Sequence, residues 1–157
     1  MKTFTKKEAL ERLPIIEAEL QQLKKAINEP KDIIEMIQSY EDACEVIGED
    51  PIESLPFKNP KNARQEAANA FHMLDIISEA LLEGKKLDWT DSNVKKLYPY
   101  FNDYTPGSGF RFLGTNYVWA NAYGGARLCV DTEAKARHFG SHPNFLPIWN
   151  KFLNPIK

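Results

Sequence analysis

Cysteines, long apolar runs and secretion signals are scarce or missing in this chain of 157 residues, and each shortage excludes a class of protein. The two cysteines, Cys44 and Cys129, form no Cys-x-x-Cys pair, so a zinc ribbon and a thioredoxin-like motif are excluded and both are expected to be reduced, buried thiols. No apolar run approaches the roughly 20 residues of a membrane span, and the charged N-terminus does not resemble a signal peptide. A cytoplasmic protein that does not bind membranes is predicted.

Strong net charge and catalytic signatures are also missing. The formal charge of −2 provides no long-range attraction toward nucleic acid or an anionic membrane. Gly107-Ser108-Gly109 has too few glycines for a phosphate loop, and no nucleophile elbow or dinucleotide fingerprint is present. We therefore predict no catalytic residue and no cofactor, and an enzyme is the weaker interpretation.

The composition that remains is typical of a folded globular protein, with 43% hydrophobic and 27% charged residues. The length fits one domain of ordinary size. We predict a single domain over 1–157, made of an N-terminal helical segment, 1–30, and an α+β core, 31–157.

The N-terminal segment carries a narrow apolar stripe. Thr5 and Glu8 form a capping-box pattern, and Pro14 predicts a kink or break, with the main helix over about 14–28. The stripe is made by Leu10, Leu13, Ile16, Leu20, Leu23 and Ile27, at spacings of three and four. Packing of this stripe on the protein's own core is favoured, because so short a helix is marginal as an independent coiled coil. A homodimer through 1–28 is the alternative.

Cap residues and apolar periodicity predict two further helices before the sheet. Ser39 is expected to begin a short helix that Gly48 ends. A long central helix is predicted over about 61–83, with Gly84 after it. Its apolar face contains Ala63, Ala67, Ala70, Phe71, Leu74, Ile77 and Leu81.

From Leu97 onward the apolar period changes to two, which indicates strands. Four are predicted, at 97–101, 110–112, 117–119 and 126–130, with turns at 105–108, 114–115 and 123–125. Thr132 is expected to start a helix that Gly140 interrupts, and Pro143 to begin the last one. The predicted fold is α+β: N-terminal helices, one long central helix, a four-stranded antiparallel meander and C-terminal helices.

Aromatic and basic residues on this sheet form the candidate binding site. Lys95 and Lys96 lie near them in the sequence, and rings beside cations can stack bases and hold phosphates. The alternative, which we favour, is that most of the rings pack in the core and an exposed remainder anchors a protein partner. Trp89 lies in the polar loop 88–93, either as a recognition residue or as a core residue flanked by Asx turns. The candidate residues are Trp89, Tyr98, Tyr100, Arg111, Tyr117, Trp119 and Arg127.

A histidine pair raises the question of a metal. His138 and His142 are spaced by four, as two ligands on one helix face would be, and Asp131 and Glu133 could complete a ligand set. Because Gly140 makes a continuous helix doubtful, capping residues and a loop histidine are favoured, and no metal site is predicted.

Four motifs together carry a family resemblance. They are the run 39–48 (SYEDACEVIG), the run 88–101 (DWTDSN followed by KLYPYF), Gly109-Phe110, and the run 127–133 (RLCVDTE). Over about 33–154 the chain resembles a family of small proteins of unassigned activity from anaerobic gut bacteria and their phages and mobile elements. It departs from the family pattern where Gly140 and Pro143 interrupt the last helix. The resemblance implies a biological context but no site, cofactor or ligand.

These observations favour a small non-enzymatic binding or protein-interaction protein of phage or mobile-element context, with an unidentified protein as its partner. Single-stranded nucleic-acid binding through the aromatic sheet is the first alternative, and a metal-dependent enzyme is the second.

Overall fold

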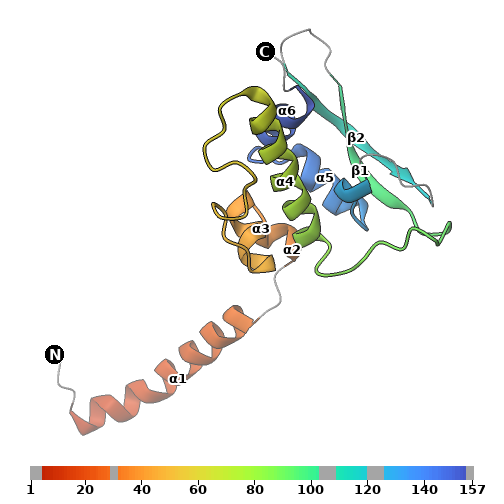
Figure 1. Cartoon of the computed structure of the whole chain (residues 1–157). Coiled ribbons are helices and arrows are strands. Elements are labelled where there is room, and N and C mark those ends of the chain that lie inside the picture. Colours follow the sequence, from red (N-terminus) through yellow and green to blue (C-terminus); the bar gives the residue numbers. More distant parts are fainter. Residues whose placement is uncertain (1–4, 29–31, 103–108, 120–125, 155–157) are drawn as a thin grey trace. The chain divides into compact units, whose positions relative to one another are not determined.

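The computed structural model describes residues 5–28, 32–102, 109–119 and 126–154. The chain divides into two compact units, Met1–Asp32 and Ile33–Lys157. They correspond to the predicted N-terminal segment and core, and their assignment to a single domain stays a prediction. Within the described residues there are six α-helices and one two-stranded antiparallel sheet (Figure 1), which confirms the α+β class.

The first unit consists of helix α1 (Lys6–Asn28). The predicted capping box is confirmed: the Glu8 carboxylate accepts a hydrogen bond from the Thr5 backbone N–H at 2.9 Å, and the Glu8 N–H donates to Thr5 Oγ1 at 3.4 Å. Of the predicted kink or break at Pro14, the break is wrong, because α1 runs through this residue without interruption. A proline in a helix interior removes one hydrogen bond, and the Leu, Glu, Ala, Gln and Lys residues around Pro14 all have high helix propensity.

The second unit begins with three helices whose ends follow local signals. Helix α2 (Ile33–Met36) is one turn, and α3 (Tyr40–Ile47) starts at Ser39, whose Oγ accepts the Asp42 N–H at 3.1 Å. Gly48 ends α3 in the left-handed conformation, with φ of 78°. Helix α4 (Ala63–Leu81) is the predicted central helix, and the side chain of Asn62 caps its first turn.

The sheet consists of β1 (Lys96–Asn102) and β2 (Arg111–Val118), so the predicted four-stranded meander is wrong. The expected strands at 110–112 and 117–119 belong to one strand, because Gly114 and Thr115 do not turn but pair with Tyr100 and Pro99. The expected strand at 126–130 is instead the 3₁₀ helix η1 (Ala126–Leu128), followed by a single bridge between Val130 and Leu97. The turns expected at 105–108 and 123–125 lie outside the described residues.

Two C-terminal helices, α5 (Glu133–Ser141) and α6 (Leu146–Leu153), complete the unit. Thr132 caps α5 as predicted, because its Oγ1 accepts the Lys135 N–H at 3.3 Å. The predicted interruption at Gly140 is wrong. Gly140 is a buried residue inside α5, where the missing side chain lets the helix approach Pro99 and Phe112 of the sheet.

The core lies where α4 packs between α3 and α6, and where α5 packs against both strands. Figure 1 shows the sheet along one side of these helices. Cys44 and Cys129 are buried and form no disulfide, as predicted. Among the described residues, no helix combines the length and hydropathy needed to cross a bilayer. The largest fully buried apolar side chains are Phe139, Phe145, Ile37, Leu74, Ile77, Leu81 and Val130.

Candidate functional site

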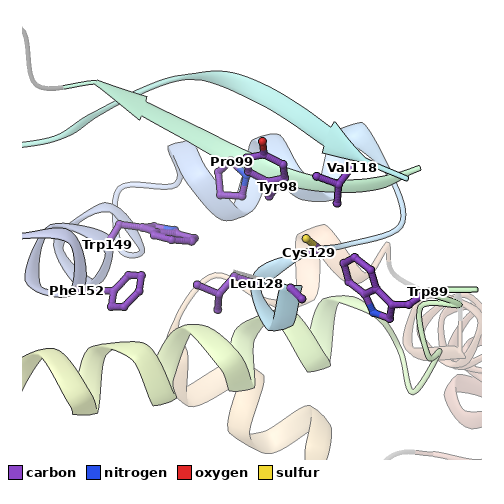
Figure 2. Close-up of a pocket in the computed structure, with 9 residues that line it drawn as sticks. Trp89, Tyr98, Pro99, Val118, Leu128, Cys129, Trp149 and Phe152 are labelled. Carbon is purple, nitrogen blue, oxygen red and sulfur yellow. The ribbon is translucent and has the colours of Figure 1, made fainter. Parts of the chain in front are cut away.

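A cavity of about 580 Å³ lies between the sheet and the segments that carry α6 and η1. Figure 2 shows Trp149 and Phe152 at one end of it and Trp89 at the other. Its volume falls within the roughly 300–1,000 Å³ of typical small-molecule sites, which are also mostly apolar and aromatic. The lining residues are Trp89, Tyr98, Pro99, Val118, Ala126, Leu128, Cys129, Trp149 and Phe152.

Trp149 and Phe152 form an aromatic wall that is fixed by its own contacts. They are three residues apart on α6 and therefore lie on neighbouring positions of one helix face. The Trp149 indole N–H donates to the carbonyl oxygen of Phe139 at 2.9 Å, and its ring centroid lies 4.8 Å from that of Phe101. The Phe152 ring lies 5.4 Å from that of Phe71 on α4. These contacts fix both rings without any bound ligand.

The opposite end of the cavity is set by the loop that carries Trp89. Asp88 Oδ1 accepts hydrogen bonds from the Thr90 N–H at 2.8 Å and the Thr90 hydroxyl at 2.6 Å, and these bonds lower the Asp88 pKa. Asp91 Oδ1 accepts the Asn93 N–H at 2.7 Å. The predicted Asx turns are therefore confirmed, and they hold the half-buried Trp89 at the cavity.

Lys96 fastens this loop to β1, which the sequence did not predict. Its side chain is fully buried, and its ammonium donates to the carbonyl oxygens of Asp91 at 2.7 Å and Val94 at 2.8 Å. The ammonium also lies 5.7 Å from the Trp89 ring centroid, within cation–π range. The sequence suggested that Lys96 could hold a phosphate at the surface. In the structure its ammonium instead donates to backbone carbonyl oxygens of the loop.

Replacing Lys96 by methionine is expected to lower the free energy of unfolding by about 1.5–3 kcal/mol, because the carbonyl oxygens of Asp91 and Val94 lose a charged donor. Urea unfolding followed by circular dichroism measures the change. Lys95→Met is the matched control, because Lys95 is the exposed neighbour. This variant loses only cation–π contacts, so its free energy of unfolding should fall by no more than about 1 kcal/mol. Equal losses in both variants would contradict the anchoring role of Lys96.

Cys129 contributes apolar surface to the cavity rather than a nucleophile. Burial raises the pKa of its thiol to about 11, so the thiol stays protonated at neutral pH. Its backbone is fixed from α4, because the Ser78 hydroxyl donates to the Cys129 carbonyl oxygen at 3.1 Å. A protonated, buried thiol of this kind behaves as a small hydrophobic side chain.

Trp119 and Tyr117, two of the predicted site residues, lie on the exposed surface instead. Their ring centroids are 5.2 Å apart in an edge-to-face arrangement. The Lys95 ammonium lies 4.4 Å from the Tyr117 centroid and 5.4 Å from that of Trp119. We call Lys95, Tyr117 and Trp119 the exposed aromatic patch.

The remaining predicted residues do not join either group. Arg127 is paired with Asp75, its Nη2 lying 2.6 Å and its Nε 2.8 Å from the two carboxylate oxygens. Tyr100 is exposed farther along β1, and Arg111 begins β2. Arg111 is six residues from Tyr117, or about 20 Å at about 3.3 Å per strand residue. The seven predicted residues therefore divide among a cavity, an exposed patch, an ion pair and the far end of the sheet.

Each of the two histidines has a hydrogen-bond partner within the protein. His138 Nε2 lies 2.6 Å from the carbonyl oxygen of Ile37, and His142 Nε2 lies 3.0 Å from Gln38 Oε1. Burial, followed by the nearby His138, lowers the His142 pKa. These contacts join the end of α5 to the segment between α2 and α3.

The two carboxylates considered with the histidines have cationic partners of their own. Asp131 lies 3.1 Å from the Lys135 ammonium, and Glu133 lies 3.5 Å from the Arg137 guanidinium. Over the part of the chain that the structure describes, no three His, Cys, Asp or Glu side chains are grouped closely enough to hold a metal ion.

No protein-family model, curated protein or solved structure matches this chain. The resemblance to the phage-associated family stays a prediction, and the functional argument rests on the geometry of the cavity.

Proposed function

We propose that the protein is a small non-enzymatic binding protein that takes a neutral, ring-containing small molecule in its cavity. The observation that carries the proposal is an apolar cavity of about 580 Å³ with preformed aromatic ends. Burial of apolar surface supplies the affinity, and the rings of Trp149 and Trp89 offer edges and faces for aromatic contact.

The lining also determines the charge of the ligand. Among the residues that the structure describes, the nine that line the cavity all have side chains of types that are neutral at pH 7. The buried cation beside Trp89, Lys96, already donates to two backbone carbonyl oxygens. A charged ligand group would therefore lose its hydration without gaining a partner of opposite charge. We expect neutral ligands to bind more tightly than ionised ligands of the same shape.

Calorimetric titration with 2-naphthol, and with 2-naphthoate as an anion that carries the same ring system, tests this proposal. We expect saturable binding of one naphthol per chain and at least tenfold weaker binding of naphthoate, because an isolated buried charge is costly. Equal affinities, or no naphthol binding, would contradict the proposed site.

A larger side chain at a lining residue should occupy the cavity and weaken the binding of 2-naphthol. Ala126→Trp adds a large ring at the lining, and we expect at least a tenfold loss of naphthol affinity. Ala134→Trp is the matched control, because Ala134 is exposed on α5 and does not line the cavity. Val118→Phe fills the cavity from β2 and serves if Ala126→Trp fails to fold. An equal loss in Ala134→Trp would place the naphthol elsewhere.

The cellular context of this proposal comes from the family resemblance. That resemblance supports a phage or mobile-element setting in the bacterial cytoplasm. A binding protein in that setting can present its loaded state to a protein partner, and Tyr, Trp and cationic side chains such as those of the exposed aromatic patch are frequent anchors at protein interfaces.

Single-stranded nucleic-acid binding is the second candidate, favoured by the exposed aromatic patch alone. Exposed rings beside a lysine are the elements that stack bases and contact phosphate. Arg127, however, already pairs with Asp75, and Arg111 lies far along the strand. Oligonucleotide binding that weakens steeply with salt and disappears in Trp119→Ala would favour this candidate over the cavity.

A further inference from the structure

Taken by itself, the first unit presents a regular stripe of apolar side chains on helix α1. Leu13, Ile16, Leu20 and Leu23 are 49–60% exposed. In proteins most helical stability comes from packing of the apolar face rather than from helix propensity. A helix of 23 residues with such a stripe therefore fits a partner surface of matching shape.

The spacing of the stripe is that of a coiled coil. The four residues follow one another at intervals of three, four and three, and Ile27 continues the repeat in the sequence. This is a repeat of about 3.5 residues, in which Leu13 and Leu20 occupy the a positions and Ile16 and Leu23 the d positions. A helix that packs on a globular core commonly has a wider stripe, with apolar residues also at e or g. Here Leu10 falls at an e position, whereas the e and g positions from 12 to 24 are all charged.

The flanking positions are charged and favour a parallel second copy. Arg12 and Glu19 occupy g positions, and Glu17 and Lys24 occupy e positions. In a parallel pair each g residue approaches the e residue five positions later on the other helix. Arg12 then meets Glu17 of the other copy, and Glu19 meets Lys24, so both contacts join opposite charges.

The antiparallel arrangement of the same stripe has the opposite electrostatics. If Leu13 were aligned with Leu23 of the other copy, g would lie near g and e near e. Glu19 would then approach Glu19 and Glu17 would approach Glu17, which are like-charge contacts.

We propose that copies of this chain associate through α1 as a parallel, in-register coiled coil. This association is separate from ligand binding in the cavity and goes beyond it. The a positions hold Leu13 and Leu20, but the d positions hold one isoleucine, Ile16, which favours more than two strands beside leucines at a, and one leucine, Leu23, which is common at d in dimers. The number of copies is therefore read from the measured mass.

Sedimentation equilibrium of the full chain tests the association. We expect a multiple of the 18.0 kDa chain mass for the native protein and 18.0 kDa for Leu20→Glu, which places a charge in the stripe. Gln21→Glu adds the same charge at the neighbouring b position and should keep the native mass. A native mass of 18.0 kDa at every concentration would overturn the proposal, as would dissociation by Gln21→Glu alone.

Charge reversal tests the pairing without altering the apolar stripe. Glu17→Lys should raise the dissociation constant severalfold, because it faces Arg12 of the other copy with a like charge. Adding Arg12→Glu to the same chain should restore the native value. An unchanged constant in Glu17→Lys would contradict the assigned register.

Cysteine linkage tests the direction of the helices. Leu13→Cys should oxidise to a linked pair by itself, because the a positions of parallel copies face each other. The native thiols of Cys44 and Cys129 are buried and should not compete. Linkage that forms only when Leu13→Cys is mixed with Leu23→Cys would show an antiparallel arrangement and contradict the proposal.

Discussion

Gly140→Ala is expected to lower the free energy of unfolding by about 3 kcal/mol, the upper part of the usual cost of overpacking a core. A Cβ at this position would lie closer than 3.0 Å to carbon atoms of Pro99 and Phe112, both in the sheet that α5 packs against. The direction is informative, because a glycine replaced by alanine inside a helix ordinarily gains about 0.5–1 kcal/mol.

Urea unfolding of the purified variant measures this loss. Gly114→Ala is the matched control, because a Cβ at Gly114 in β2 would meet no atom within 4 Å. We expect Gly114→Ala to change the stability by less than about 0.5 kcal/mol. If Gly140→Ala were as stable as the native chain, the close packing of α5 on the sheet would be wrong.

Trp149→Ala is expected to cost about 3–5 kcal/mol, as large-to-small substitutions of buried aromatic residues do. The indole contacts the rings of Phe101, Phe139 and Phe152 at centroid distances of 4.8, 4.9 and 6.2 Å. It also satisfies the carbonyl oxygen of Phe139, which would lose its donor.

Trp149→Phe separates the packing from the hydrogen bond. Phenylalanine keeps one ring in the wall but cannot donate to the carbonyl oxygen of Phe139. We therefore expect the free energy of unfolding to fall by roughly 1–3 kcal/mol, from the unsatisfied acceptor and the smaller ring. Thermal unfolding of both variants gives the comparison. A loss below about 1 kcal/mol for Trp149→Ala would contradict the fixed aromatic wall.

Helix ends were predictable from the sequence because their partners are local. Thr5, Ser39 and Thr132 each cap a helix through a residue three positions later. The central helix was predictable for the same reason, since apolar spacing along one helix does not depend on distant residues. Gly140 was misread because the packing that uses it involves residues about 30–40 positions earlier, and a glycine's local signal is only that of a helix breaker.

The sheet was mispredicted because strand pairing is non-local. Gly114-Thr115 has the composition of a turn, but Tyr100 and Pro99 offer backbone partners that keep the strand extended. Leu128 and its neighbours have the composition of a strand, yet only Val130 finds a ladder partner. In both places the decisive contact lies beyond any sequence window.

The site was predictable in part. Trp89 and Tyr98 were selected for their aromatic chemistry and do line the cavity. Trp149 and Phe152 were read only as the apolar face of a helix, and no local signal distinguishes a ring that lines a cavity from a ring that fills a core. The partner of Arg127 is Asp75 on α4, 52 residues earlier, so this ion pair could not be read from the sequence.

Methyl NMR spectra of the full chain during a titration with 2-naphthol test the cavity proposal most directly. Leu128 and Val118 line the cavity, whereas Leu74 and Ile37 are fully buried elsewhere in the core. We predict that the methyl signals of Leu128 and Val118 shift and saturate at one naphthol per chain, while those of Leu74 and Ile37 stay in place. Unchanged methyl signals of Leu128 and Val118 at saturating 2-naphthol would contradict the account.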